Sequence, residues 1–271
     1  QHLAAERQRL YPHGLPPFSF TPIKRADEFV PTAEEFAAQT VANDYAIITL
    51  GRTSGEAADR RAEEFALKES EAALIKAVSE AYHKAGKPVV VILNICSPIE
   101  TASWKESVDA ILCAFQPGQE AGNSITDVLT GKVNPSGHLP MTFQVAYGDA
   151  LSDKNFPYDY EFQLPDFGMG SGMNFQNKNK VEKPKEPVRN VDYTVYEEGV
   201  YVGYRYFDTF SKAVSYPFGH GLSYTDFKYE VLSSAISTDK CTVDVKVTNT
   251  GSVPGKASVQ VYVKAPRGSM D

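Results

Sequence analysis

The apolar positions of this chain fall into short, nearly continuous runs. Three of these runs have the length and composition of buried strands: Asp44–Leu50 (DYAIITL), Lys87–Asn94 (KPVVVILN) and Val108–Phe115 (VDAILCAF). They are rich in β-branched residues and carry few polar ones, which is typical of parallel strands covered on both faces. The pattern therefore predicts three strands of a mostly parallel sheet.

Segments with helical spacing of apolar residues lie before and between these runs, at Pro31–Asn43, Glu69–Gly86 and Glu120–Gly131. The second and third each end on a glycine, a common helix C-cap. Strands that alternate with helices predict an α/β sandwich with helices on both faces of the sheet. Ligands usually bind such sheets at the carboxyl ends of the strands, so the loops that follow the strands are the candidate positions for catalytic or ligand-binding residues.

The remaining segments set the predicted domain limits. Residues 1–31 contain a short helical pattern and a proline-rich stretch, and are expected to be a connector. Residues 32–223 form the α/β domain, with a long irregular excursion at 145–192 that is rich in Gly, Asn, Lys and Pro. Residues 224–271 alternate polar and apolar positions in FKYEVLSSAIS, CTVDVKVTNTG and ASVQVYVKAP, which predicts three strands of a partial antiparallel β-sandwich.

Composition excludes several classes of function. The chain has 271 residues, 42% of them hydrophobic, and a net charge of −7, so nothing favours binding to nucleic acid or to an anionic membrane. The three cysteines are widely spaced and lie outside any CxxC pattern, which argues against a metal site or a disulfide framework. The stretch GRTSGE lacks the Lys-Ser/Thr ending that phosphate binding requires. No cofactor is expected.

Four long motifs occur in a fixed order along the chain: SGEAADR, QPGQEAGNSITDVLTGKVNPSGHLPMTF, VYEEGVYVGYRYFDTF and YPFGHGLSYTDFKYE. Together they closely resemble the C-terminal half of family 3 glycoside hydrolases of the β-glucosidase type. The resemblance covers residues 32–264. Within it, VTNTGSVPGKASVQVYV is similar to the opening of the fibronectin-III-like domain that follows in many members.

The resemblance implies a retaining, exo-acting β-glycosidase, with a β-glucosidase the first expectation. Its active site would lie between this domain and a TIM-like barrel. In such enzymes the barrel supplies the nucleophilic aspartate, usually within Ser-Asp-Trp, and that tripeptide does not occur in this sequence. We therefore expect a β-glucoside or oligosaccharide as substrate, a barrel domain as partner, and no activity from this chain alone. For the compartment, a periplasmic or secreted location is favoured over a cytoplasmic one.

Glu56 is the candidate general acid/base. It follows the first predicted strand, and Gly55 beside it frees the backbone. Retaining glycoside hydrolysis needs two carboxyl groups about 5–5.5 Å apart, one of which holds its proton near neutral pH. In β-glucosidase-like members the glutamate of Ser-Gly-Glu has this role, and it matches Glu56. Asp59 and Arg60 are expected to contact sugar hydroxyls or to position the loop. Ala57 departs from the glycine common at its position in the family.

Several alternatives remain open at this stage. Glu197 and Glu198 are rival acid/base candidates, and Gln119 with Glu120 forms a second polar cluster for which a structural role is favoured. The interleaved tyrosines of YEEGVYVGYRYFD are interpreted as strand packing, with a sugar-stacking platform as the alternative. His138, in the turn-forming stretch NPSGHLP, is interpreted as a surface residue, and His220, between two glycines, as part of a structural turn. The alternative function is a non-catalytic carbohydrate-binding or structural domain of a multidomain glycosidase, since some family members place the acid/base in a barrel loop.

Overall fold

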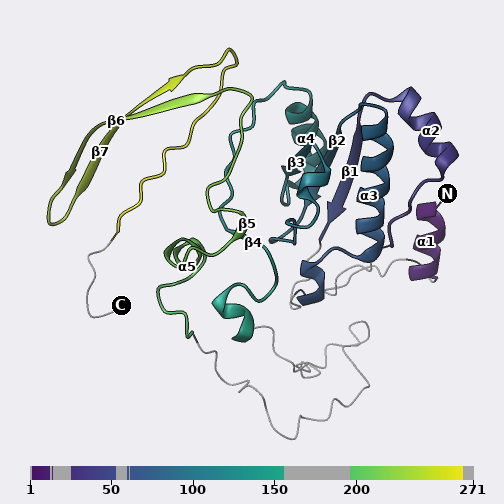
Figure 1. Cartoon of the computed structure of the whole chain (residues 1–271), viewed down its shortest axis with the longest axis horizontal. Coiled ribbons are helices and arrows are strands. Elements are labelled where there is room, and N and C mark those ends of the chain that lie inside the picture. Colours follow the sequence, from purple (N-terminus) through teal and green to yellow (C-terminus); the bar gives the residue numbers. More distant parts are fainter. Residues whose placement is uncertain are drawn as a thin grey trace, which may run out of the picture.

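The computed structural model of the chain describes residues 2–12, 14, 26–52, 60, 62–155 and 196–264 (Figure 1). A three-stranded parallel sheet forms the core of the α/β part, made of β1 (Ala46–Gly51), β2 (Val89–Asn94) and β3 (Ala110–Cys113) in the order β1-β2-β3. Ala46 pairs with Val89 and Gly51 with Asn94, while Val90 pairs with Ala110. The three predicted strands and their parallel arrangement are confirmed.

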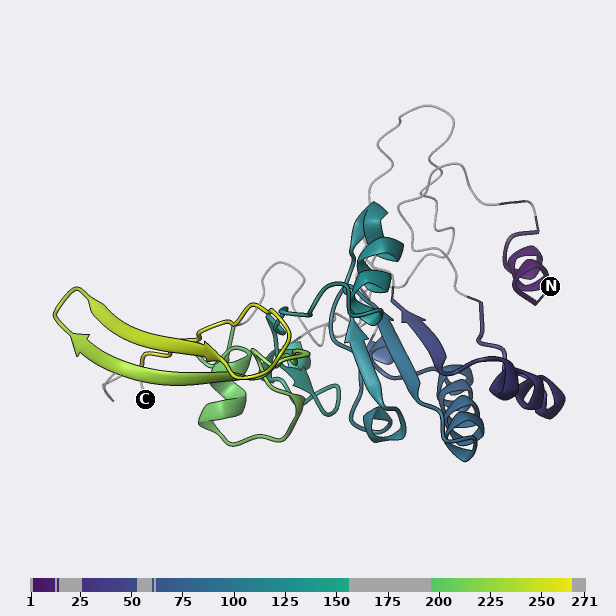
Figure 2. The ribbon, with the colours of Figure 1, turned by 90° about the horizontal axis from the view of Figure 1, so that it is seen from above.

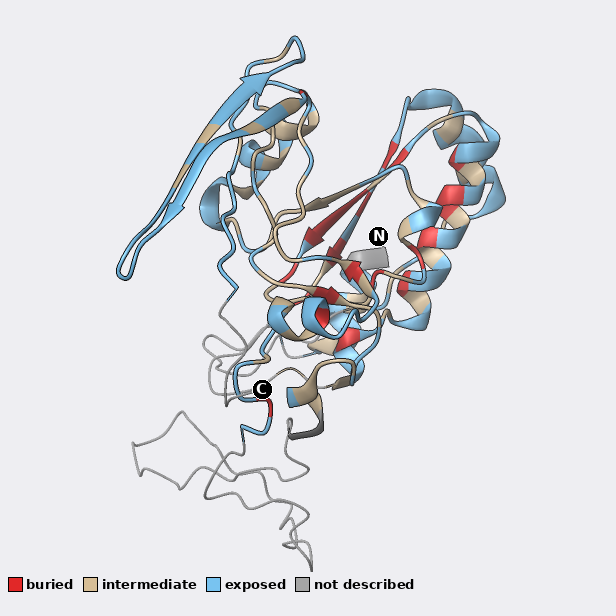
Figure 3. Cartoon of the chain, turned by 60° about the vertical axis from the view of Figure 1, so that its left-hand side comes forward, coloured by how far each residue is buried: buried red, intermediate tan, exposed pale blue. Residues whose placement is uncertain are grey.

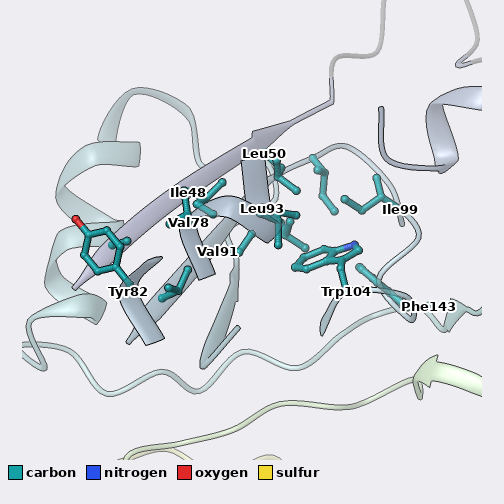
Figure 4. Close-up of a cluster of buried hydrophobic side chains, with 13 residues drawn as sticks. Ile48, Leu50, Val78, Tyr82, Val91, Leu93, Ile99, Trp104 and Phe143 are labelled. Atoms are coloured by element: carbon teal, nitrogen blue, oxygen red, sulfur yellow. The ribbon is translucent and has the colours of Figure 1, made fainter. Parts of the chain in front are cut away.

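Helix α3 (Glu69–Lys84) covers one face of this sheet and forms the core with it (Figure 4). Ile75, Val78 and Tyr82 of the helix pack on alternate residues of β1 and on β2. Figure 3 shows that the buried residues gather on the sheet and on the inner side of α3. The C-cap of the helix is Ala85, and Gly86 directly after it has a φ of +70°, the left-handed conformation that favours glycine just past a helix end.

The other helices complete the α/β part. Helix α1 spans His2–Leu10, and α2 spans Ala33–Ala42 and begins with a capping box in which Thr32 and Glu35 bond each other's backbone N–H. Helix α4 (Ala121–Leu129) lies on the side of the sheet opposite α3 (Figure 2), so the prediction of helices on both faces is confirmed. Among the described residues, no helix is both long and apolar enough to cross a membrane.

A small antiparallel pair connects the two halves of the described chain. Strand β4 (Phe143–Gln144) pairs with β5 (Val214–Tyr216), and the short helix α5 (Tyr204–Thr209) precedes β5. The interpretation of the interleaved tyrosines as strand packing is wrong, because Tyr204 and Tyr206 lie on this helix. Their rings pack on neighbouring aromatics: Tyr204 stacks on Phe218 with ring centroids 4.8 Å apart.

The C-terminal part contains one antiparallel hairpin, β6 (Phe227–Ile236) and β7 (Cys241–Asn249). Two of the three strands predicted there are confirmed. The third is not, since residues 257–264 join no ladder. This segment instead contacts the α/β side of the molecule, where Gln260 Nε2 donates to Gly219 O over 3.2 Å. An apolar groove lies between it and the hairpin, lined by Tyr229, Val245 and Val261 among others.

Asn134 fastens the α/β part to the C-terminal hairpin. Its Oδ1 accepts from Ser223 Oγ over 2.9 Å and from the backbone N–H of Tyr224 over 2.8 Å, and its Nδ2 donates to Pro254 O over 3.1 Å. Tyr224 extends the junction by donating its hydroxyl to Val128 O over 2.9 Å. One amide side chain therefore uses both its polar atoms to join three segments that are distant in sequence.

Candidate functional site

The candidate site lies at the carboxyl edge of the parallel sheet. There β1 ends at Gly51, β2 at Asn94 and β3 at Cys113. Backbone hydrogen bonds continue past these ends, from Arg52 N to Asn94 O over 3.0 Å and from Ala114 N to Leu93 O over 2.9 Å. The segments that follow the three strands therefore start side by side, as the parallel arrangement requires.

The predicted site residues Glu56 and Asp59 lie outside the described residues. Arg60 is described, and its guanidinium is directed at the segment that follows β2. Its Nη1 donates to Ser97 Oγ, and it lies 3.4 Å from Ser97 O and 3.3 Å from Pro98 O. Its Nη2 donates to Glu64 O over 2.7 Å. Arg60 therefore links the segment after β1 to the segment after β2.

A buried ion pair stands at the end of β1, immediately before the motif that carries Glu56. Arg52 and Glu71 are 4% and 0% exposed, and they meet in a bidentate pair with Nη1–Oε1 at 2.7 Å and Nη2–Oε2 at 2.8 Å. Glu71 Oε2 also accepts from the backbone N–H of Lys68 over 2.8 Å. Arg52 is not among the site residues predicted from the sequence. The signal was present, because an arginine that ends a buried strand needs a buried partner, and Glu71 lies in the first turn of the next helix.

The second polar cluster lies after β3, around a tight turn. Phe115 and Gly118 both have positive φ, at 50° and 72°, and Gly118–Glu120 forms a 3-10 turn ahead of α4. Glu120 Oε2 accepts from Asn123 Nδ2 over 2.6 Å, at the start of the helix. Gln119 and Glu120 are exposed. Glu120 therefore bonds a residue of the first turn of the helix that follows it, and the structural role of the pair stays a prediction.

The rival carboxylates and the two histidines have different surroundings. Glu198 is 8% exposed and Glu197 is exposed, in the turn that precedes α5. His138 Nδ1 lies 2.9 Å from Gly219 O, and the His220 ring lies 4.9 Å from that of Tyr216. His220 follows the turn at residues 218–219, in agreement with the interpretation from the sequence, whereas His138 is half-buried rather than a surface residue, because its ring bonds the Gly219 carbonyl.

Metal and thiol chemistry find little support in the described part of the chain. No group of three or more His, Cys, Asp or Glu side chains there has the arrangement to hold a metal ion. Burial raises the pKa of the Cys113 thiol to about 11, so this side chain stays protonated near neutral pH and is a poor nucleophile.

Comparison with known families decides the classification. Residues 9–204 match the family described as the glycosyl hydrolase family 3 C-terminal domain, which is most of the chain. The chain belongs to glycosyl hydrolase family 3. This family 3 chain is 41% identical to β-glucosidase B of Emericella nidulans over 186 residues, which cover 67% of the chain and 19% of that protein. It is 35% identical to a β-glucosidase of Ruminococcus albus over 229 residues, 83% of the chain and 20% of that protein.

Solved structures give the same answer for the fold. The family 3 chain is 37% identical to β-glucosidase 3B of Thermotoga neapolitana in complex with α-D-glucose, with a TM-score of 0.73 over 92% of this chain and 31% of that one. It is 29% identical to a β-glucosidase of Paenibacillus barengoltzii, with a TM-score of 0.66 over 83% of this chain and 22% of that one. The chain spans about a fifth of the length of the curated relatives named above.

Proposed function

We propose that this chain is part of a retaining, exo-acting β-glucosidase that hydrolyses terminal, non-reducing β-linked glucose. The observation that carries the proposal is the family match over residues 9–204, together with a neighbour of known structure that binds glucose and is 37% identical. Residues 32–223 are the family's α/β sandwich domain in this proposal, and residues 224–271 are the start of a fibronectin-III-like domain. A TIM-like barrel domain supplies the nucleophilic aspartate.

Glu56 is the general acid/base of the proposed reaction. In the first step Glu56 protonates the glycosidic oxygen while the barrel aspartate attacks the anomeric carbon. In the second step the Glu56 carboxylate takes a proton from the water that releases the sugar. Two features support Glu56. It lies four residues after Arg52, which is held at the carboxyl edge of the sheet, and such edges are the usual ligand sites of parallel α/β sheets. No cofactor takes part, because two carboxyl groups suffice for this chemistry.

Asp59 and Arg60 complete the proposed site. Both follow Glu56 closely enough to contact sugar hydroxyls or to position the loop. The hydrogen bonds of Arg60 to Glu64 O and to the Ser97–Pro98 segment favour positioning, since they engage its terminal nitrogens with other parts of this chain.

The test is a Glu56→Gln variant of the full-length enzyme that carries this chain. Glu63→Gln is the matched control, because Glu63 is an exposed glutamate of the nearby 3-10 helix. Loss of a positioned general acid costs about 10²–10⁴-fold in rate. We expect a loss of that size in kcat/KM on cellobiose, whose leaving group needs a proton. Activity on 2,4-dinitrophenyl β-glucoside, whose leaving group needs none, should fall far less in the glycosylation step.

Two further outcomes decide against parts of the proposal. Equal, modest losses on both substrates would show that Glu56 is not the acid/base, and would favour a non-catalytic binding or structural domain. The 271-residue chain alone is expected to give no turnover of an aryl β-glucoside. Turnover by the chain alone would place the nucleophile inside it and remove the need for a barrel partner.

A further inference from the structure

One backbone oxygen receives hydrogen bonds from two arginines that flank the SGEAAD stretch. Glu64 O accepts from Arg52 Nε over 2.9 Å and from Arg60 Nη2 over 2.7 Å. Arg52 immediately precedes residues 53–59 and Arg60 immediately follows them. The side chains of Arg52 and Arg60 therefore meet at one acceptor, although seven residues separate the two arginines along the chain.

The Arg52 end is fixed by a complete set of partners. An arginine side chain has five N–H donors, and the five hydrogen bonds of Arg52 use all of them. Besides Glu64 O and the two carboxylate oxygens of Glu71, the guanidinium donates to Gly51 O over 2.8 Å and to Ala66 O over 3.0 Å. Charge-assisted bidentate bonds in a buried site are short, strong and specific in geometry. The end of β1 is thereby locked to α3 and to the segment 64–66.

The Arg60 end is fixed against the segment that follows β2. Its Nη1 contacts the carbonyls of Ser97 and Pro98, which follow β2. A backbone bond of 2.7 Å from Glu100 N to Phe65 O joins the same two segments, and Phe65 is buried. Glu64 O therefore belongs to a segment that is bonded to the residues after β2 on one side and, through Arg52, to the end of β1 and to α3 on the other.

We propose that Arg52 and Arg60 act as a clamp that positions the acid/base of the proposed function. The clamp consists of Arg52, Glu71, Arg60 and the carbonyl of Glu64. Apolar residues of similar size stabilise a fold about as well as a buried ion pair does, so stability alone gives little reason for this arrangement. The need for a defined geometry is a better reason, because a displacement of a catalytic group by about 1 Å from its productive position costs about 10²-fold in rate. This inference rests on the proposed function, since it needs Glu56 to be the acid/base.

The test compares Arg60→Ala and Arg60→Lys in the full-length enzyme, with Lys76→Ala as control on the exposed side of α3. Lysine keeps the charge but lacks the planar fork that reaches Glu64 O and the Ser97–Pro98 carbonyls together. We expect Arg60→Ala to lower kcat/KM on cellobiose about 10- to 100-fold and to change kcat/KM on 2,4-dinitrophenyl β-glucoside less than threefold. Arg60→Lys should show the same selectivity with a smaller loss, and Lys76→Ala should equal the parent enzyme.

The selectivity between leaving groups is the readout that a merely structural role would not produce. A raised KM on both substrates with kcat unchanged would assign Arg60 to substrate binding and overturn the clamp. Unchanged kinetics on cellobiose would overturn it as well. If Arg60→Ala fails to fold, Arg60→Lys carries the same comparison. The Glu56→Gln variant separates the two proposals: leaving-group selectivity in Glu56→Gln without selectivity in the Arg60 variants rejects the clamp alone, whereas no selectivity in Glu56→Gln rejects the proposed function.

Discussion

Replacing Glu71 by leucine tests the energetic importance of the buried ion pair. Glu71 is fully buried, and its carboxylate accepts two hydrogen bonds from Arg52 and one from the backbone of Lys68. Leucine has a similar volume and no acceptor. The substitution therefore leaves Arg52, which is 4% exposed, without an anionic partner in an environment that solvates charge poorly.

The expected cost follows from these contacts. Removal of one partner of a buried pair costs about 3–5 kcal/mol. The Lys68 N–H at the start of α3 also loses its acceptor, and loss of a helix cap costs about 1 kcal/mol. We therefore expect Glu71→Leu to lower the free energy of unfolding by about 4–6 kcal/mol. Glu71→Gln should cost less, because the amide oxygen still accepts one of the Arg52 hydrogen bonds.

A double-mutant cycle with Arg52→Met gives the coupling directly, from urea unfolding of the 271-residue chain. The double variant still loses the donors to the carbonyls of Gly51, Glu64 and Ala66, so it will not regain the parent stability. It no longer holds an unpaired buried charge, so it should be about 2–3 kcal/mol more stable than the sum of the single effects predicts. If the cost of the double variant equals the sum of the two single costs within about 0.5 kcal/mol, this account of the pair is refuted.

Two other predictions concern the junction beside the sheet. Burial lowers the pKa of His220, and the nearby Lys105 and His138 lower it further. A group whose pKa is lower in the folded state stabilises the fold at pH values above its unfolded pKa, which is about 6.5 for histidine. This stabilisation is lost as the pH falls through the folded-state pKa. The fall in melting temperature from pH 7.5 to 5.5 should therefore be smaller in His220→Gln than in the parent chain, and an identical fall would contradict the assignment. A methyl group at Gly221 would meet Gly137 O and lie 2.8 Å from His138 Nδ1, so Gly221→Ala should cost about 1–3 kcal/mol in urea unfolding. Gly137→Ala is the matched control, because a Cβ there meets nothing within 4 Å, and equal costs for the two would show that the close approach does not matter.

The parallel sheet was predictable because its signal is local. Strand β2 is a nearly continuous β-branched run with four of its six residues buried, and β1 is an apolar run in which the alternate residues Ala46, Ile48 and Leu50 are buried. Helix α5 was not predictable in this way. Its six residues are too few to show helical periodicity, and Tyr204 and Tyr206 on either side of Arg205 imitate the alternation of a strand.

The site was predictable only in part. The SGEAADR motif indicates the stretch that we propose carries the acid/base, and Arg52, which precedes it, lies at the edge of the sheet where β1 ends. The clamp was not foreseen, because Arg52 and Arg60 meet at a backbone carbonyl. Every residue offers such an acceptor, so no side-chain pattern distinguishes the one at Glu64.

The junction at Asn134 has a consequence for where this protein can be divided. The change to strand-like alternation predicts a boundary between residues 223 and 224, yet Asn134 bonds Ser223, Tyr224 and Pro254 at once. A shorter chain that ended at residue 223 would strip this amide of two of its three bonds and leave Val128 O without the Tyr224 hydroxyl. The hairpin β6–β7 and the α/β part should therefore be kept together as one unit in engineered fusions, and should stay together in natural rearrangements.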